Sequence, residues 1–282
     1  MGKRILSGAA VTVIAVAAIL LGGNVLAAIL LIVSCTAFRE LCKATGVHNG
    51  KGMDLLENVG YVGIIAYYFL IWQSGEGKGL VSGEHMMLFL MMLCIGMLML
   101  IMAVYVLTFP KYRSEQIMAV YFSMIYAPVM LSFIYLTECM EHGFYLVWMI
   151  FISSWVCDTC AYFTGVTFGK HKMAPVLSPK KSIEGAIGGV VGSTAVGALY
   201  AVLIVQRVIP DRNLIIIFAV ICGIGAVISQ IGDLAASAIK RNHEIKDYGT
   251  CIPGHGGIMD RFDSVIFTAP MIYFMARLLI GA

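Results

Sequence analysis

The chain has 282 residues, of which 60% are hydrophobic and only 12% are charged, and its formal net charge is +3 at pH 7. This hydrophobic content excludes an ordinary soluble domain, and the small charge, without a run rich in Lys and Arg, argues against a nucleic-acid partner. The eight cysteines are scattered along the chain, most of them within apolar runs, which argues against a disulfide framework.

The apolar runs predict an all-α polytopic bundle of about nine transmembrane helices. Most of the runs are close to the ~20 residues that cross a bilayer as a helix, and none shows the alternation of a barrel strand. The first run has a rival interpretation as a cleaved signal peptide, but it is long and another apolar run follows directly. The nine runs are 5–22, 25–38, 59–73, 86–108, 116–137, 144–168, 184–206, 213–236 and 262–280.

The basic residues are distributed unevenly between the two sides of this nine-span arrangement. Fifteen of the 19 Lys and Arg residues fall on the side that holds the N-terminus, and only Lys78, Arg207, Arg212 and Arg277 fall on the other. Because short cytoplasmic loops carry an excess of basic residues, we expect an integral protein of a bacterial inner or plasma membrane with its N-terminus in the cytoplasm.

The two halves of the chain differ in the polarity of their spans and of the loops that connect them. Residues 1–140 have few polar groups inside their spans and are expected to form a transmembrane scaffold. Residues 141–282 are expected to form the catalytic region, because they contain two cytoplasmic loops, 169–183 and 238–261, that combine Gly, Pro, Ser and charged residues.

One group of candidate residues surrounds the first of these loops. Asp158 lies inside an apolar span, where an acid is costly and often functional, although a helix contact through Ser154 or Thr159 is the structural alternative. Lys180 and Lys181 are candidates to bind phosphate. Ser182 is a substrate-binding candidate that, with Glu184, is also suited to cap the next helix. The glycines Gly185, Gly188, Gly189 and Gly192 are expected to allow close helix packing.

A second group runs from Gln230 to Ser264. Asp233, Ser237, Lys240 or Arg241, and Glu244 recur every three or four residues, so they would form one stripe if the helix continues beyond the membrane. A carboxylate, a hydroxyl and a cation would then face one pocket.

The same stretch continues into a loop and the last span. Lys246, Asp247, His255, Gly256 and Gly257 are candidates for phosphate binding or catalysis, since backbone N–H groups of glycines can approach an anion closely. The last span then opens with Asp260 and Arg261. Taken singly, Asp260 also suits a helix cap, and Lys240 with Arg241 also suits an interface anchor.

Together these residues favour nucleotidyl transfer. Attack at the α-phosphorus of a nucleoside triphosphate concentrates negative charge, which cations and a hard metal ion neutralise. Asp233 and Asp260 are the candidate ligands for Mg²⁺, which typically binds through one or two carboxylates together with substrate phosphates. Lys240, Asp247 and His255 complete the candidate catalytic set, and Arg241, Lys246 and Arg261 the candidate phosphate ligands.

The stretch from Ser237 to Asp263, SAIKRNHEIKDYGTCIPGHGGIMDRFD, closely resembles the signature of the phosphatidate cytidylyltransferase family. DTCAYFTGVTFGK and SPKKSIEG resemble other shared blocks of that family, so the resemblance covers roughly residues 150–282. It implies conversion of CTP and phosphatidate to CDP-diacylglycerol and pyrophosphate in phospholipid biosynthesis, at a cytoplasm-facing cavity open to membrane lipid. It further implies a homodimer, metal binding by Asp233 and Asp260, and Ser237 in the same site; a second, monovalent cation stays open.

Two rival functions remain at this point. A CTP-dependent polyprenol or phytol kinase also joins a nucleotide to a lipid, but it releases CDP. An ion-coupled transporter would use Asp158 and Asp233 as a relay. No internal repeat supports that alternative, and the polar residues gather at one face rather than at the midplane.

Overall fold

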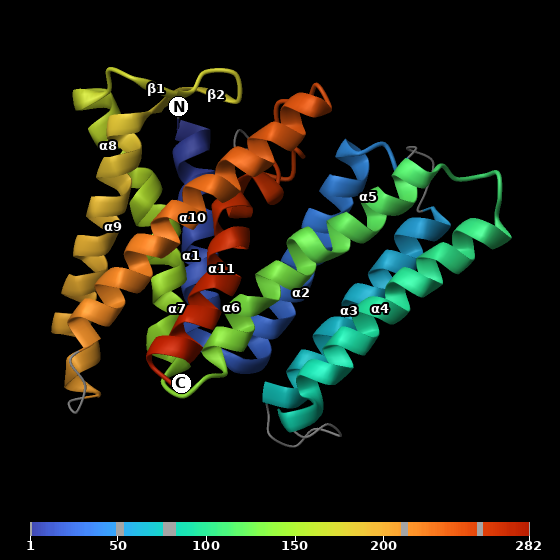
Figure 1. The fold of residues 1–282 in the computed structure, drawn as a ribbon, viewed down its shortest axis with the longest axis horizontal. Helices are drawn as coiled ribbons and strands as arrows, with labels where there is room; N and C mark the ends of the chain where they lie inside the picture. The colour runs from blue at the N-terminus through green and yellow to red at the C-terminus, as the bar shows by residue number, and fades with distance from the viewer. Residues whose placement is uncertain (1, 49–53, 76–82, 210–213, 253–255, 282) are drawn as a thin grey trace. The chain divides into compact units, whose positions relative to one another are not determined.

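The computed structural model describes residues 2–48, 54–75, 83–209, 214–252 and 256–281. The chain folds into two compact units that are built largely of helices, which Figure 1 shows as coiled ribbons. The first unit contains Met1–Leu136 and Ile245–Arg261, and the second contains Thr137–Glu244 and Phe262–Ala282.

The first unit is a set of long helices in which α2 packs against α1, α3 and α5. A π-helical turn at Ile125–Val129 joins α5 to α6, and it contains Pro128, which has no N–H to continue the helical ladder. The helices are α1 (Gly2–Leu21), α2 (Gly23–Ala44), α3 (Leu55–Gly75), α4 (Gly83–Leu107), α5 (Ser114–Met124) and α6 (Met130–Glu138).

The second unit is organised around α9, which packs against both α8 and α10. A second π-helical turn, Ile152–Val156, joins α7 to α8, and a short 3₁₀ turn, Val205–Arg207, follows α9. Its elements are α7 (Gly143–Phe151), α8 (Cys157–Phe168), β1 (Lys172–Ala174), β2 (Ser178–Ser182), α9 (Ile183–Leu203), α10 (Leu214–Asn242) and α11 (Met259–Leu279), the last from Phe262 onward.

The helices confirm an all-α integral membrane protein. Within the described residues, eight helical segments are long and apolar enough to cross a bilayer, and α1 adds a shorter apolar stretch, Ala10–Leu21. Several polar side chains are satisfied inside their own helices: the hydroxyls of Thr36, Thr194 and Thr268 each donate to the carbonyl four residues earlier. This matters because lipid supplies no hydrogen-bond partners.

Several helices extend beyond the apolar runs that predicted them. α2 ends at Ala44 rather than 38, and α10 ends at Asn242 rather than 236. The added turns carry Glu40, Lys43, Lys240 and Arg241, and such residues are good helix formers even where hydropathy has dropped. The prediction therefore located the apolar cores of these helices but not their ends.

The glycines of α9 pack against α8, as the sequence predicted. A Cβ at Gly188 would collide with Thr164, one at Gly189 would approach Cys157, and one at Gly192 would meet Cys160. Small residues of this kind let two helix backbones approach closely in a membrane.

The segment 169–183, expected only as a loop, contains an antiparallel hairpin. Lys172 pairs with Ser182 and Ala174 with Ser178. Glu184 fixes the start of the hairpin, because its carboxylate accepts the backbone N–H groups of Lys170 and His171 and pairs with His171 Nδ1 at 2.6 Å. The hairpin thereby holds Lys180 and Lys181 directly before α9.

Candidate active site

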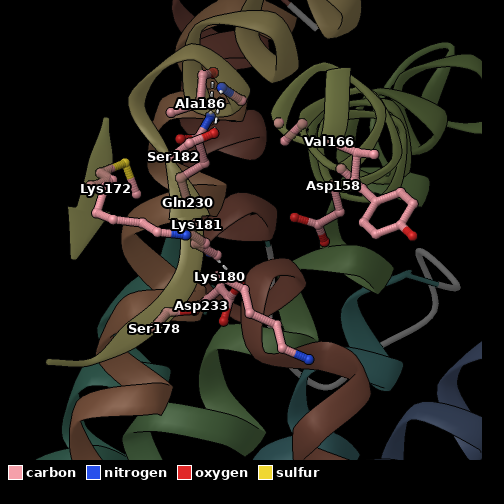
Figure 2. Close-up of a pocket in the computed structure, with 15 residues that line it drawn as sticks. Asp158, Val166, Lys172, Ser178, Lys180, Lys181, Ser182, Ala186, Gln230 and Asp233 are labelled. Carbon is pink, nitrogen blue, oxygen red and sulfur yellow. Dashed lines mark hydrogen bonds and ion pairs between the residues drawn. The ribbon is translucent and has the colours of Figure 1, made fainter. Parts of the chain in front are cut away.

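A pocket of about 540 Å³, lined by charged and apolar side chains, lies in the second unit. Side chains from α8, the hairpin, α9 and α10 surround it, as Figure 2 shows. Its lining includes Asp158, Tyr162, Gly165, Val166, Lys172, Ser178, Lys180, Lys181, Ser182, Gln230 and Asp233. Five residues proposed from the sequence, Asp158, Lys180, Lys181, Ser182 and Asp233, therefore meet in one place.

An ion pair between Lys181 and Asp233 is the main charge contact of the pocket. Lys181 Nζ contacts Asp233 Oδ2, and both side chains are 25% exposed, so the pair is partly shielded from water. Figure 2 draws the contact as a dashed line. Because one partner is a cation, an incoming phosphate can compete with the carboxylate for it.

Asp158 faces the same charges. Ser154 and Thr159, its expected structural partners, donate their hydroxyls to the backbone carbonyls of Ile150 and Trp155. The Asp158 carboxylate instead interacts with Asp233, Lys181 and Ser264. This placement favours the functional interpretation of Asp158.

Ser182 and Gln230 shape the wall of the pocket. Ser182 caps α9, since its Oγ accepts the Gly185 N–H at 3.1 Å, and its hydroxyl proton can still be donated. A Cβ at Gly165, Gly169 or Gly185 would come close to that Oγ. Gln230, to which the sequence assigned no role, donates to the Ala186 carbonyl at 3.0 Å from α10.

The stripe expected along α10 is present except at its last member. Ser237 lies one turn from Asp233, with Oγ and Oδ1 3.5 Å apart, and Lys240 and Arg241 occupy the final turn. Glu244 lies beyond the helix with a φ of 55°. The helix ends before that position, so the inclusion of Glu244 in the stripe was wrong.

Asp260 is held by the backbone of the first unit. Its Oδ2 accepts N–H groups from Tyr248 at 2.8 Å and from Gly257 at 3.0 Å. Gly256 has a φ of +85°, and a Cβ there would approach Asp260 and Asp247. The N–H of Gly257, which was expected to face a phosphate, is therefore used by a carboxylate of the chain.

The other loop candidates occupy different settings. Lys246 and Asp247 are exposed, whereas the Nε of Arg261 is buried in the first turn of α11 without a hydrogen-bond partner among the described residues. His255 lies outside the described residues, together with Pro253 and Gly254.

Sequence reasoning missed Glu40, a buried acid on α2. Its carboxylate accepts the N–H groups of Ile258 at 3.1 Å and Met259 at 2.8 Å, next to Asp260. The sequence does contain a signal for it, because Glu40 closely follows the apolar run 25–38, and an acid at such a position is a candidate for a specific role.

The pocket carboxylates could supply only part of the coordination shell of a magnesium ion. Within the described part of the chain, no group of three or more His, Cys, Asp or Glu side chains is placed to hold a metal. Asp233 and Asp158 are nevertheless hard oxygen donors in one pocket, and magnesium usually takes one or two carboxylates and fills its remaining positions with water and phosphate oxygens.

A comparison with protein families points to the same family as the signature residues. The model of the cytidylyltransferase family matches residues 2–279. The chain belongs to the cytidylyltransferase family. It is therefore a nucleotidyltransferase enzyme, and the match extends through the N-terminal helices, beyond the residues 150–282 that carried the resemblance.

Curated relatives of this cytidylyltransferase include proteins named phosphatidate cytidylyltransferase from three bacteria. The Bacillus subtilis protein is 29% identical over 282 residues, which is 99% of this chain and 98% of the relative. The Staphylococcus saprophyticus protein is 37% identical over 163 residues, covering 57% of this chain and 60% of the relative. The Thermotoga maritima protein is 35% identical over 176 residues, with coverage of 61% and 63%.

Proposed function

We propose that this cytidylyltransferase transfers the cytidylyl group of CTP to phosphatidate, forming CDP-diacylglycerol and pyrophosphate. The observation that carries the proposal is the pocket itself, which places Lys180 and Lys181 opposite acids and beside exposed apolar residues, Tyr162 and Val166. Such a site suits a polyphosphate on one side and a lipid on the other. The names of the relatives support the same substrates.

In this reaction an oxygen of the phosphatidate phosphate attacks the α-phosphorus of CTP. A new phosphorus–oxygen bond forms as the bond between the α-phosphorus and the bridging oxygen breaks, and pyrophosphate leaves with that oxygen. The attacking phosphate is already ionised, so a protein nucleophile is not required. The protein contributes orientation and neutralisation of charge.

The lysines of the hairpin would bind the triphosphate. Lys181 now contacts Asp233, and a phosphate oxygen entering the pocket would share or replace that carboxylate. Lys180 is exposed and also lines the pocket, where its charge would stabilise the leaving pyrophosphate. Lys240, Arg241, Lys246 and Arg261 are proposed as further phosphate ligands.

Magnesium is the proposed cofactor, with Asp233 and Asp260 as its protein ligands. When bound, the ion would neutralise charge on the phosphates. The chemistry of the donors supports this assignment, since both are carboxylates, and Ser237 adds a hydroxyl beside Asp233. For a second cation and for a homodimer, the family resemblance is the only support.

We further propose that the catalytic side faces the cytoplasm of a bacterial cell. The unequal distribution of basic residues supports that orientation. It also agrees with the chemistry, because CTP is a cytoplasmic substrate.

The test uses the detergent-purified chain with phosphatidate, magnesium and CTP labelled either at the α- or at the γ-phosphate. Transfer of the α-label alone to the lipid fraction is the expected result. Transfer of the γ-label would instead identify a lipid kinase, and an absence of label in lipid with either substrate would overturn the proposal. Omission of magnesium, and the variants Asp233→Asn and Asp260→Asn, should each abolish most of the transfer.

A further inference from the structure

We infer that Glu40 is a positioning residue for the reaction: from α2 it fixes the start of α11 and thereby the place of Asp260. This inference rests on the proposed function, in which Asp260 is a metal ligand. Glu40 lies 220 residues away in sequence from Asp260, within the same compact unit.

The hydrogen bonding at the start of α11 couples the two carboxylates. The first N–H groups of a helix have no partner within it and attract negative charge. Here Gly257 donates to Asp260, while Ile258 and Met259 donate to Glu40 Oε1 and Oε2 at 3.1 and 2.8 Å. Three consecutive N–H groups are thus divided between two carboxylates, so the positions of these carboxylates depend on each other.

The burial of Glu40 makes these hydrogen bonds necessary. The residue is only 5% exposed, and a carboxylate is costly to bury unless hydrogen bonds compensate it. The donors identified in the described residues are the two amides and the thiol of Cys251. Glu40 is therefore held specifically by the segment that carries Asp260.

Two glycines of the same segment lie against Glu40. A Cβ at Gly249 or Gly257 would collide with the Glu40 carboxylate. Neither glycine has a positive φ, so the close approach of Glu40 explains why a side chain is excluded there. The loop fits around the carboxylate on two sides.

The main test compares Glu40→Gln with Glu57→Gln in the full chain. Glu57 is a matched control, because it is another buried acid of the same unit, 1% exposed, and its partners are His48 and Asp54. In Glu40→Gln the new amide can accept one N–H but presents its own NH₂ to the other. We expect this variant to lower the rate at saturating CTP and phosphatidate by about tenfold or more, and to raise the magnesium concentration that gives half the maximal rate.

The control should leave the magnesium dependence unchanged even if it lowers thermal stability, which separates positioning from general destabilisation. Amide hydrogen exchange over residues 248–259 gives a readout independent of activity, and we expect faster exchange in Glu40→Gln. A wild-type magnesium dependence and unchanged exchange in Glu40→Gln would overturn the inference. Wild-type protein that makes no CDP-diacylglycerol would instead overturn the proposed function, and the exchange data would still decide whether Glu40 holds this segment.

A second variant approaches the same contact from the loop. Gly249→Ala should reduce the rate when Glu40 is present, because the new methyl group meets the carboxylate. In a Glu40→Ala background the same change should cost little, since non-additivity is the mark of direct contact. Equal losses in both backgrounds would contradict the inference.

Discussion

Asp233 and Asp260, two of the acids proposed for the reaction, have different kinds of partner, and this difference determines whether a substrate can displace that partner. Asp233 pairs with the side chain of Lys181, a partner that a phosphate can take over. Asp260 accepts two backbone N–H groups, which remain in place only while the loop keeps its conformation. Asp233 is thus suited to respond to substrate, and Asp260 to provide a fixed ligand.

Lys181→Gln should lower kcat/KM for CTP by about 10- to 100-fold, because it removes a charge from the phosphate site and leaves Asp158 and Asp233 close together without that cation. Initial rates against CTP concentration measure the effect. Lys111→Gln is the matched control, since Lys111 is exposed and its ion pair with Asp54 lies in the other unit. An unchanged kcat/KM in Lys181→Gln would exclude Lys181 from CTP binding.

At the level of residues, the sequence predicted which charged side chains gather in the pocket better than it predicted their contacts. The sequence singles out Asp158 because an acid inside an apolar span is costly, Asp233 as part of a helical stripe, and Lys180 with Lys181 as phosphate ligands; the pocket contains all four. Glu40 escaped because its partners, Ile258 and Met259, are more than 200 residues away. Only the tertiary fold brings an acid of α2 to the start of α11.

At the level of elements, α9 has two structural roles: its first turn positions the preceding hairpin, and its glycines pack against α8. Its first residue follows the Ser182 cap, so the preceding hairpin and its lysines are set by the start of this helix. Its glycines then seat the helix against α8, which carries Asp158. The separation between the lysines and Asp158 therefore depends on close packing of two helices.

Gly188→Ala should destabilise the second unit. The added methyl group collides with Thr164 on α8. Overpacking of this kind costs about 1–3 kcal/mol against the ~1 kcal/mol that alanine gains over glycine in a helix, so we expect a net loss of up to about 2 kcal/mol. Thermal unfolding in detergent measures the loss. Gly96→Ala is the control, because nothing lies within 4 Å of its new Cβ; equal shifts in both variants would contradict tight packing of α8 and α9.

Element ends were harder to predict than element types. Hydropathy identifies the apolar part of a helix, but α10 continues to Asn242 through residues that lie beyond its apolar part. The β1–β2 hairpin was missed because its short strands, KMA and SPKKS, lack an apolar alternation. Its first strand is preceded by His171, which contacts Glu184 at the start of α9.

At the scale of the whole molecule, the main question is the direction in which the chain crosses the membrane. The proposed orientation, with nine spans and the N-terminus inside, would place the turn between α6 and α7 outside the cell and the loop between α10 and α11 inside. Each of these connections carries an exposed cysteine, Cys139 and Cys251. The native chain therefore contains two reporters of orientation.

A membrane-impermeant maleimide should label Cys139 in intact cells, but Cys251 only in inverted membrane vesicles. Partial desolvation and the neighbouring Glu40 carboxylate raise the pKa of the Cys251 thiol. Because the thiolate is the reactive form, labelling of Cys251 should be slow near neutral pH and should accelerate as the pH rises. Cys139→Ser and Cys251→Ser identify the two signals, and labelling of Cys251 rather than Cys139 in intact cells would reverse the proposed orientation and place the signature loop away from cytoplasmic CTP.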